Sequence, residues 1–384
     1  MKILLCLASV HPDCGGPTTA AHGMADSLAR AGHYVTTIAH DDGDGTGLSV
    51  REVSSSSVDM LPNNSVVRFK RTTNRWQASV AYASWIVKNV RSYDAVVVHS
   101  LFLAHTQYVA RTARFLNVPY AIRPHGSLNE ADIAASNSRN KRRYIKIFER
   151  GTLNKAQFIF CTSESEAEGV RSWTRTPANV IPLGVTTEQL KPSPASSRDR
   201  SLVCFVGRVA EKKGLEILVE ALPAMVEAVP DVRVVIAGPD EGGRIGRLQD
   251  RLTQLGVARK VEFPGFLGPA EKQELYRKAG VFVLPSRDEN FGISTAEALY
   301  AGLPVVISRG VSHAGAVQES GAGVVVERDP SELSAAVVLI ATEVIAEYSE
   351  RSRRAHELAS TSYSWDKTCA GILAGFELNP KVRA

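Results

Sequence analysis

Short apolar runs rich in β-branched residues alternate with amphipathic segments along most of the chain. In the first half, such runs predict strands at 2–9, 34–40, 66–70, 95–100, 120–126, 158–163 and 180–184. Between them, the sequence predicts helices at 18–31, 76–91 and 139–155. This alternation is typical of a parallel sheet with helices on both faces.

The same alternation starts again after a polar stretch rich in Pro and Ser at 191–201, which we interpret as a linker. Strands are predicted at 202–207, 232–238, 261–265, 281–286, 305–310 and 323–327, with helices beginning near residues 214, 244, 269 and 294. The sequence therefore predicts an α/β fold with two doubly wound, Rossmann-like domains, 1–190 and 200–363, facing each other across a cleft. We expect a C-terminal helix, 364–384, to pack back on the first domain.

The composition narrows the class of protein. With 384 residues, 44% hydrophobic and 22% charged, the chain has the profile of a globular enzyme. Five scattered cysteines without a C-x-x-C spacing favour a reducing compartment and argue against a zinc site. The apolar start has no small-residue cleavage site, and no run of about 18 apolar residues occurs, so we expect a cytoplasmic protein without a transmembrane helix. No base-stacking platform or reading motif points to nucleic acid.

Each half begins with a strand that ends in a turn suited to an anion. Gly15 and Gly16 precede the first helix, where exposed amides favour an anion, although the spacing is not the dinucleotide pattern G-x-G-x-x-G. In the second half, Arg208 follows the strand and Lys213 precedes the helix. Two fixed cations suit a diphosphate whose charge grows as its bond to a sugar breaks. A solvated basic loop is the alternative, which we accept for Lys212.

Two carboxylates, Glu289 and Glu297, lie in the largely apolar stretch 286–306. A buried carboxylate without a hydrogen-bond donor costs several kcal/mol, so each needs a partner, and a ligand hydroxyl is one candidate. If helical, their spacing would separate them by roughly 12 Å. Pairs in glycoside hydrolases are about 5 to 9.5 Å apart, which argues against hydrolysis.

The loop between this strand and the next helix offers a second anion site. The amides of Asn290, Phe291 and Gly292 lie at a predicted helix N-terminus. Because Ser294 stands three residues before Glu297, a capping box explains this glutamate as well as ligand binding does.

The stretch E-N-F-G-I-S-T-A-E-A-L-Y-A-G-L-P-V-V, at 289–306, resembles the signature of the retaining, family-four, group 1 glycosyltransferases of GT-B architecture. FVGRVAEKKG resembles their phosphate-binding turn, and RPHGSL, CTSESE, IPLGV, VIAGP and YSWDKT are similar to further family segments in the right order. The chain departs from the family at Leu183, where many members have asparagine, and around Glu319, where a Gly-Gly-x-x-Glu pattern is more frequent.

The resemblance implies a role for each residue of the second half that was singled out above. Glu297 would bind the ribose hydroxyls of a nucleotide, and Glu289 would lie beside the donor sugar near the reacting carbon. Arg208 and Lys213 would hold the diphosphate. Phe266, in the similar stretch VEFPGF, would contact the base, mainly through its backbone. The amides of the loop before the helix would help to hold sugar and phosphate.

In the first half, the resemblance implies that His125 contacts an outer hydroxyl of the donor sugar, with a purely structural histidine as the alternative. Gly15 and Gly16 would let the domain close on the phosphates and the acceptor. The catalytic set predicted in this way is His125, Glu289, Arg208 and Lys213. The donor would be a nucleoside-diphosphate sugar such as UDP- or GDP-hexose, with no cofactor and no metal. The acidic string at 41–44 is interpreted as a solvated turn.

Basic residues cluster in the predicted helix 139–155, opposed by Glu149 alone. Ile147 and Phe148 contribute to an apolar side of the same segment. We interpret it as a helix that lies on an anionic membrane surface, at the inner face of the plasma membrane; an ordinary solvated face is the alternative. The basic residues predicted to lie on this acceptor side are Arg139, Lys141, Arg142, Arg143 and Lys146.

Together, these features predict a retaining, metal-independent hexosyltransferase. Its acceptor would be a lipid-linked oligosaccharide or glycolipid used to build a surface polysaccharide. Two alternatives stay open from the sequence: a transferase that acts on a small soluble acceptor, and a nucleotide-sugar-binding module without turnover. The sequence predicts neither the base, the sugar nor the linkage.

Overall fold

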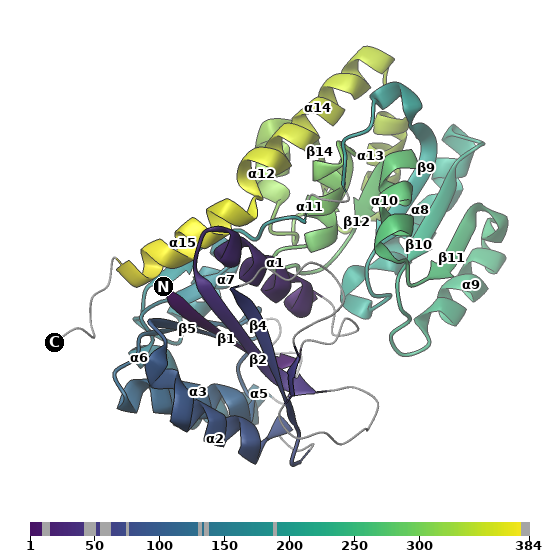
Figure 1. The fold of residues 1–384 in the computed structure, drawn as a ribbon. Coiled ribbons are helices and arrows are strands. Elements are labelled where there is room, and N and C mark those ends of the chain that lie inside the picture. Colours follow the sequence, from purple (N-terminus) through teal and green to yellow (C-terminus); the bar gives the residue numbers. More distant parts are fainter. Residues whose placement is uncertain are drawn as a thin grey trace. The chain divides into compact units, whose positions relative to one another are not determined.

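The computed structural model describes residues 1–9, 16–41, 51–53, 63–73, 77–129, 133, 138–186 and 190–377. The chain divides into two compact units (Figure 1). Unit 1 comprises Met1–Gly184 and Trp365–Ala384, and unit 2 comprises Val185–Ser364. Each unit is built around one twisted sheet with helices on both of its faces.

The sheet of unit 1 has the strand order β3-β4-β2-β1-β5-β6-β7-β8. All neighbouring pairs are parallel except β3 with β4, which is antiparallel. The strands are β1 (Lys2–Ser9), β2 (Tyr34–Asp41), β3 (Arg51–Val53), β4 (Asn64–Lys70), β5 (Ala95–His99), β6 (Tyr120–Arg123), β7 (Ile159–Cys161) and β8 (Ala178–Val180).

Helices α1 and α15 pack together on one face of this sheet, and α2 and α3 pack on the other (Figure 1). The helices of unit 1 are α1 (Gly16–Arg30), α2 (Val80–Asn89), α3 (Ala104–Phe115), α5 (Ser138–Tyr144), α6 (Arg150–Lys155), α7 (Glu164–Arg171) and α15 (Trp365–Glu377). A π-helical turn, η4 (Ile145–Glu149), joins α5 to α6, and a 3-10 turn, η3 (Val90–Ser92), follows α2.

The sheet of unit 2 is entirely parallel, with the order β11-β10-β9-β12-β13-β14. Its strands are β9 (Asp199–Val206), β10 (Arg233–Ala237), β11 (Val261–Gly265), β12 (Ala279–Leu284), β13 (Val305–Ser308) and β14 (Gly323–Val326). Helices α8, α9 and α13 cover one face, and α11, α12 and α14 cover the other.

The helices of unit 2 are α8 (Leu215–Ala228), α9 (Arg244–Gln254), α10 (Pro269–Lys278), α11 (Ile293–Tyr300), α12 (Ala314–Ser320), α13 (Pro330–Thr342) and α14 (Ile345–Ser362). Three short 3-10 turns complete the unit: η5 (Ala195–Ser197), η6 (Glu211–Lys213) and η7 (Ala258–Lys260).

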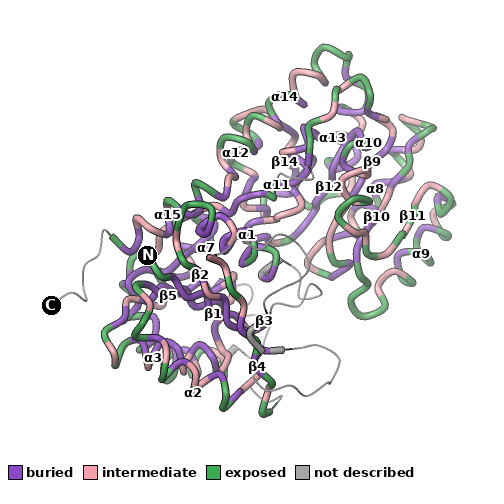
Figure 2. Tube along the Cα trace, in the orientation of Figure 1, coloured by how far each residue is buried: buried purple, intermediate pink, exposed green. Residues whose placement is uncertain are grey.

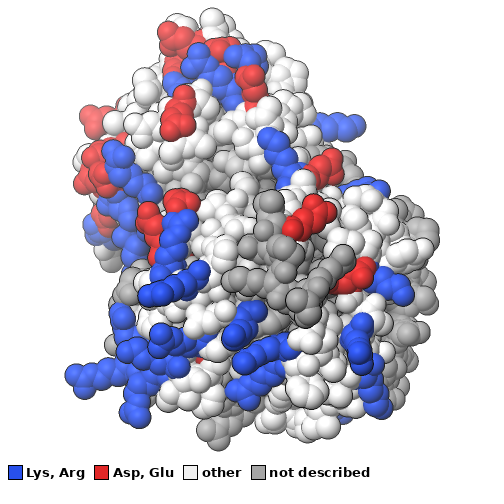
Figure 3. All heavy atoms as spheres, turned by 90° about the vertical axis from the view of Figure 1, so that its left-hand side faces the viewer, with Lys and Arg blue, Asp and Glu red and all other residues white. Residues whose placement is uncertain are grey.

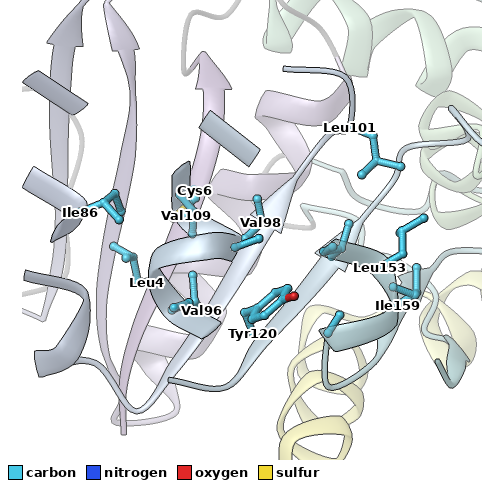
Figure 4. Close-up of a cluster of buried hydrophobic side chains, with 14 of the residues drawn as sticks. Leu4, Cys6, Ile86, Val96, Val98, Leu101, Val109, Tyr120, Leu153 and Ile159 are labelled. Carbon is cyan, nitrogen blue, oxygen red and sulfur yellow. The ribbon is translucent and has the colours of Figure 1, made fainter. Parts of the chain in front are cut away.

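The central strands are apolar on both faces because helices cover both. Every residue of β5 and of β12 is buried, and Figure 2 shows the strands buried along much of their length while the helices expose one side. In unit 1, Val96 and Val98 of β5 pack with Leu4 of β1 and with Val109 of α3 (Figure 4). Burying a side chain of this size stabilises a fold by about 1.5 to 3 kcal/mol, so this cluster anchors the sheet.

The C-terminal helix α15 belongs to unit 1, although it follows unit 2 in the sequence. Its Phe376 ring meets that of Phe158 edge to face, with centroids 5.1 Å apart. Ser27 of α1 donates a hydrogen bond of 3.3 Å to Asp366, and Thr368 donates one of 2.8 Å to the Pro182 carbonyl. Helix α15 therefore links α1 to the segment that follows β8.

The prediction of an α/β fold with two doubly wound sheets is confirmed. The elements differ from prediction in three places. The stretch 191–201 lies inside unit 2, and its last three residues already belong to β9. The run 180–184 is extended only to Val180, where β8 ends, and the helix around 76–91 begins at Val80 because the Ser79 side chain caps it.

Candidate functional site

The loops that follow β9, β12 and β13 meet at the carboxyl edge of the unit 2 sheet. The Arg287 amide donates a hydrogen bond of 2.7 Å to the Lys212 carbonyl, which also accepts one of 2.9 Å from the Ser286 hydroxyl. The Glu289 amide donates a hydrogen bond of 2.9 Å to the Gly310 carbonyl. These hydrogen bonds hold the loop of Lys212 and Lys213 in a fixed position relative to Glu289.

Glycine allows the first two of these loops to approach closely. Gly214 has φ +67°, a left-handed conformation, and a Cβ at this position would lie 2.3 Å from the Pro285 carbonyl oxygen. Such a distance is far below van der Waals contact, so only glycine fits here without displacing the backbone. The position of the loop that carries Lys213 therefore depends on a residue without a side chain.

Gly214→Ala is expected to lower the free energy of unfolding by about 2 to 4 kcal/mol, the sum of backbone strain and a steric clash. Gly242→Ala is the matched control, because Gly242 has φ +76° but a Cβ added there would have no atom within 4 Å. It should cost only the strain, about 1 kcal/mol. Urea denaturation of both variants measures the difference, and equal losses would show that the close contact is unimportant.

Lys213 and Glu289 form an ion pair that is almost buried. The Lys213 Nζ donates a hydrogen bond to Glu289 Oε1, and only 11% and 10% of the two side chains are exposed. The Ser286 hydroxyl lies 3.0 Å from the same carboxylate oxygen and can turn its one proton from the Lys212 carbonyl to this oxygen. The carboxylate thus has two protein donors on one oxygen, which leaves acceptor capacity on the other.

The electrostatics of this pair keep Glu289 ionised. Burial alone would raise the pKa of its carboxyl, but the charges of Lys213 and Lys212 and the hydrogen bonds from Lys213 and Ser286 outweigh burial and lower the pKa below its ordinary value. An ionised carboxylate only accepts hydrogen bonds, so Glu289 is suited to bind and orient a hydroxyl group and not to donate a proton.

Glu297 also has protein partners. Lys272 Nζ donates a hydrogen bond of 2.7 Å to its Oε1, and the Tyr276 hydroxyl donates one of 3.1 Å to its Oε2. Both partners lie on α10, one helical turn apart. The capping-box alternative is wrong, because α11 begins at Ile293 after the left-handed Gly292, which places Ser294 inside the helix.

The residues before α11 are positioned by an aromatic cluster. Phe291 is buried, and its ring meets those of His313 and Tyr363 edge to face, with centroids 4.7 and 5.5 Å away. His313 and the Tyr363 hydroxyl are 2.8 Å apart, and burial lowers the pKa of His313 to about 4, so its ring is neutral at pH 7. Gly292, the N-cap of α11, has no side chain to cap the first turn, so the amide dipoles of that turn can serve an anion.

Of the other predicted residues of unit 2, Arg208 and Phe266 are exposed and Asn290 is half-buried. Arg208 follows β9, 58% of its side chain is exposed, and its Nη1 donates a hydrogen bond of 2.8 Å to Glu241. Phe266 follows β11 and is 71% exposed. The structure brings Lys213 and Glu289 into direct contact. Arg208 shares their sheet edge but contacts neither of them.

His125 lies in unit 1, directly after β6. It has a left-handed backbone, φ 54°, and its Nε2 lies 3.2 Å from Nδ1 of His99. Burial, together with the charge of Arg123, lowers its pKa well below the ordinary value. The neutral ring can therefore donate or accept a hydrogen bond but carries no charge. Ser100 and Phe102, after β5, are also left-handed, so strained backbone gathers at this edge of the sheet.

Two of the predictions about candidate site residues fall wholly or partly outside the described residues. Gly15 is one of them, whereas Gly16 is the first residue of α1. The acidic string 41–44 is the other, since only the backbone of Asp41, at the end of β2, is described. Among the described residues, no group of three or more His, Cys, Asp or Glu side chains is placed to hold a metal ion.

The basic helix predicted at 139–155 is present as α5, η4 and α6. Its one acidic residue, Glu149, faces inward and accepts hydrogen bonds of 2.9 and 2.8 Å from the Phe102 amide and the Gln107 side chain. Arg139, Arg142, Arg143 and Lys146 are exposed and Lys141 is half-buried. Of the apolar residues, Ile147 and Phe148 are 65% and 43% exposed, whereas Ile145 is buried. No helix within the described ranges is long and apolar enough to cross a membrane.

Sequence reasoning missed the partners of the two glutamates. Ser286, Lys272 and Tyr276 hold the carboxylates, yet no short motif singles them out. The four-residue spacing of Lys272 and Tyr276 places them on one face of α10, which is the only signal that the sequence offers.

Comparison with known proteins covers both units. The family model described as "Glycosyl transferases group 1" matches residues 186–355, and the model described as "Glycosyl transferase 4-like domain" matches residues 15–184. The boundary between the two matches falls within two residues of the boundary between the units.

Several curated proteins are similar in sequence. The chain is 28% identical to a GDP-mannose:cellobiosyl-diphosphopolyprenol alpha-mannosyltransferase from Xanthomonas campestris, over 95% of this chain and 93% of that protein. It is 26% identical to a D-inositol 3-phosphate glycosyltransferase from Corynebacterium urealyticum, over 76% of this chain and 73% of that protein.

Solved structures share the fold at low sequence identity. A sucrose-phosphate synthase from Thermosynechococcus elongatus aligns over 98% of both chains with a TM-score of 0.77 and 18% identity. HepE from Anabaena, in complex with UDP and glucose, aligns over 98% of this chain and 100% of that chain with a TM-score of 0.75 and 19% identity.

Proposed function

The chain belongs to the group 1, family-four glycosyltransferases of GT-B fold, and from this premise we propose that it transfers a hexose from a nucleoside-diphosphate sugar to a hydroxyl group of a lipid-linked glycan. The observation that carries the proposal is the buried contact between Lys213 and the ionised Glu289 at the carboxyl edge of the unit 2 sheet. It places a cation and a hydroxyl acceptor side by side, as a sugar joined to a diphosphate requires.

Stabilising the leaving diphosphate is the main task in this reaction. As the bond between the anomeric carbon and the phosphate oxygen breaks, negative charge grows on the diphosphate. Lys213 and Arg208, which lie at the same sheet edge, supply positive charge there, and the uncapped N-terminus of α11 supplies amide dipoles. Arg208 would exchange its solvated partner Glu241 for a phosphate oxygen, which binds a guanidinium more strongly.

The two glutamates would hold the two ends of the donor. Glu289 accepts a hydrogen bond from a hydroxyl of the sugar, and Glu297 accepts hydrogen bonds from the ribose. Lys272 and Tyr276 support this role because they hold the Glu297 carboxylate in one orientation. Phe266 and the amides of Asn290, Phe291 and Gly292 complete the donor side, and Gly15, Gly16 and His125 belong to unit 1.

The transfer would proceed with retention at the anomeric carbon, by a same-face route. The acceptor oxygen forms its bond to the anomeric carbon on the face from which the diphosphate leaves. The acceptor's proton passes to the departing phosphate oxygen, so the protein needs to supply no general base. Because Glu289 is held ionised by Lys213, it orients the sugar through this step without titrating near neutral pH.

A lipid-linked acceptor is favoured by the distribution of charge. Unit 1 has 24 Lys and Arg residues against 16 Asp and Glu residues, a formal charge of +8, whereas unit 2 has 21 against 24, a formal charge of −3. Figure 3 draws the left-hand side of Figure 1 and shows Lys and Arg side chains gathered on its lower part, with few acidic side chains among them. The Xanthomonas campestris relative is named for a diphosphopolyprenol acceptor, and Ile147 and Phe148 present apolar surface beside the basic residues.

Donor binding is expected to raise the melting temperature of the protein. A ligand at 100 times its dissociation constant stabilises the folded state by about 2.7 kcal/mol, which shifts the melting temperature of a chain of this size by several degrees. A thermal-shift screen of UDP-, GDP- and ADP-sugars, with the free nucleosides as controls, measures this effect. If no nucleoside-diphosphate sugar shifts the transition more than its nucleoside does, the proposed donor class is wrong.

A small soluble acceptor is the second candidate, because the Corynebacterium urealyticum relative is named for transfer to inositol 3-phosphate. Incubating the protein with its donor and either a polyprenyl-diphosphate glycan or an inositol phosphate distinguishes the two acceptor classes. Release of nucleoside diphosphate without any acceptor separates an enzyme from a binding module without turnover.

A further inference from the structure

A hollow of about 610 Å³ lies in unit 1, and no residue assigned to the donor is among those that line it. It is formed by α6 and by the segment that joins α7 to β8. Both elements precede strands, so the hollow lies at the amino edge of the sheet, whereas His125 follows the carboxyl end of β6. The residues that line it are Arg150, Asn154, Arg171, Ser172, Trp173, Thr174, Arg175 and Thr176.

The rim of the hollow is positively charged. Arg150, Arg171 and Arg175 are exposed, and Arg171 forms an ion pair with Glu164. Neither Arg150 nor Arg175 has an ion-pair partner within the ranges that the structure describes. Three guanidinium groups surround one concave surface, while Glu164 and Glu168 are the carboxylates whose charges act on Arg171. Clustered guanidinium groups of this kind bind phosphate groups.

The floor of the hollow is rigid and polar. The Thr174 hydroxyl donates a hydrogen bond of 2.7 Å to the Asn154 side chain, and the Thr176 hydroxyl donates one of 2.8 Å to the Leu153 carbonyl. Both threonines are buried. The Trp173 ring forms one wall, and the Arg142 guanidinium lies 5.7 Å from its centroid. Its indole Nε1 is buried and has no hydrogen-bond partner among the described residues.

We propose that this hollow binds the phosphate of an anionic lipid headgroup and so seats unit 1 on a membrane. The inference rests on the proposed function, in which basic residues of unit 1 are attracted to an anionic membrane. It deepens that proposal by assigning a defined site to the lipid headgroup. Arg150 continues the basic helix, one turn after Lys146, and is three residues from the exposed Ile147. A headgroup in the hollow would therefore lie beside the apolar side chains that would meet the acyl chains.

Vesicle binding tests the site. The double variant R150Q/R175Q removes two positive charges without breaking an ion pair, and K88Q/R91Q removes two charges from exposed positions on α2 and η3, outside the hollow. On vesicles of phosphatidylcholine with phosphatidylglycerol, we expect R150Q/R175Q to weaken binding by about 30-fold, and K88Q/R91Q to weaken it much less. If both double variants weaken vesicle binding equally, the proposal is wrong, and the attraction comes from the overall positive charge of the surface.

Binding of inorganic phosphate helps to distinguish a lipid headgroup from a soluble phosphate compound as the ligand of the hollow. Phosphate binding should change the fluorescence of Trp173, and this change should vanish in W173F and in R150Q/R175Q. If phosphate binds in this way but the two charge pairs affect vesicle binding equally, the hollow is a site for a soluble phosphate and the lipid assignment is wrong. Transfer to a detergent-dispersed acceptor should be unchanged in R150Q/R175Q, so failure of this proposal is distinguishable from failure of the proposed reaction.

Discussion

Lys213→Met is expected to lower kcat by about 100- to 1000-fold, because the departing diphosphate loses a cation in a site from which water is largely excluded. The same change is expected to lower the free energy of unfolding by about 3 to 5 kcal/mol near neutral pH, since it leaves the Glu289 carboxylate buried without a counter-charge. Steady-state kinetics and urea denaturation measure the two effects separately.

The loss of stability in Lys213→Met should depend on pH. In the native protein the pKa of Glu289 is below its ordinary value, so its ionisation stabilises the fold above about pH 4.5, and this contribution is lost as the pH falls through the folded-state pKa. Without Lys213, burial should raise that pKa, so ionisation then destabilises the fold as the pH rises. The difference between the two proteins should therefore be largest near neutral pH and should disappear as the pH falls through the lowered folded-state pKa of Glu289.

The double variant Lys213→Met with Glu289→Gln separates folding from catalysis. Removing the buried charge should recover most of the lost stability, because an amide in this position is neutral and Ser286 can still donate a hydrogen bond to it. Activity should stay low, because neither change restores the cation. A double variant that regains both stability and activity would show that Lys213 serves only to neutralise Glu289.

Arg208→Ala is expected to reduce transition-state stabilisation by about 2 to 4 kcal/mol, which corresponds to about 30- to 1000-fold in kcat/KM. Its stability should be almost unchanged, because an exposed pair such as Arg208 and Glu241 contributes only about 0 to 1 kcal/mol. Kinetics with a saturating acceptor measure the loss, and the larger part should appear in kcat.

Two control variants isolate the role of this guanidinium. Glu241→Gln removes its partner but keeps Arg208, so activity should be retained. Arg233→Ala removes an arginine of similar exposure that also forms an ion pair, with Asp199, but at the start of β10 and hence at the opposite edge of the sheet. If Arg208→Ala turns over as fast as these controls, Arg208 does not hold the leaving group.

Much of the fold could be predicted because parallel strands covered on both faces are continuously apolar. The runs AVVVH of β5 and AGVFVL of β12 are buried at every position, and such runs are visible in one sequence. Helix boundaries were harder to predict. Gly292 adopts a left-handed conformation and is the N-cap of α11, so the apparent capping-box serine, Ser294, lies two residues too far into the helix.

The candidate site was predictable in its residue types but not in its pairings. Lys213 was identified by the turn that follows one predicted strand, and Glu289 by the loop that follows another. Their contact, however, joins residues 76 positions apart and depends on β9 and β12 being neighbours in the sheet. Lys272 and Tyr276 meet Glu297 because α10 and α11 pack near one another, which no local pattern encodes. The exposed orientation of Arg208 toward Glu241 likewise depends on the loop after β10.

A crystal structure of the full chain with a nucleoside-diphosphate sugar tests the central claim most directly. We predict that the diphosphate binds at the carboxyl edge of the unit 2 sheet, within hydrogen-bond distance of Lys213 and Arg208, with a sugar hydroxyl donating to Glu289. The account would be contradicted by a diphosphate that contacts neither cation. In that result, the Lys213–Glu289 pair would be unchanged and would face solvent instead of the donor.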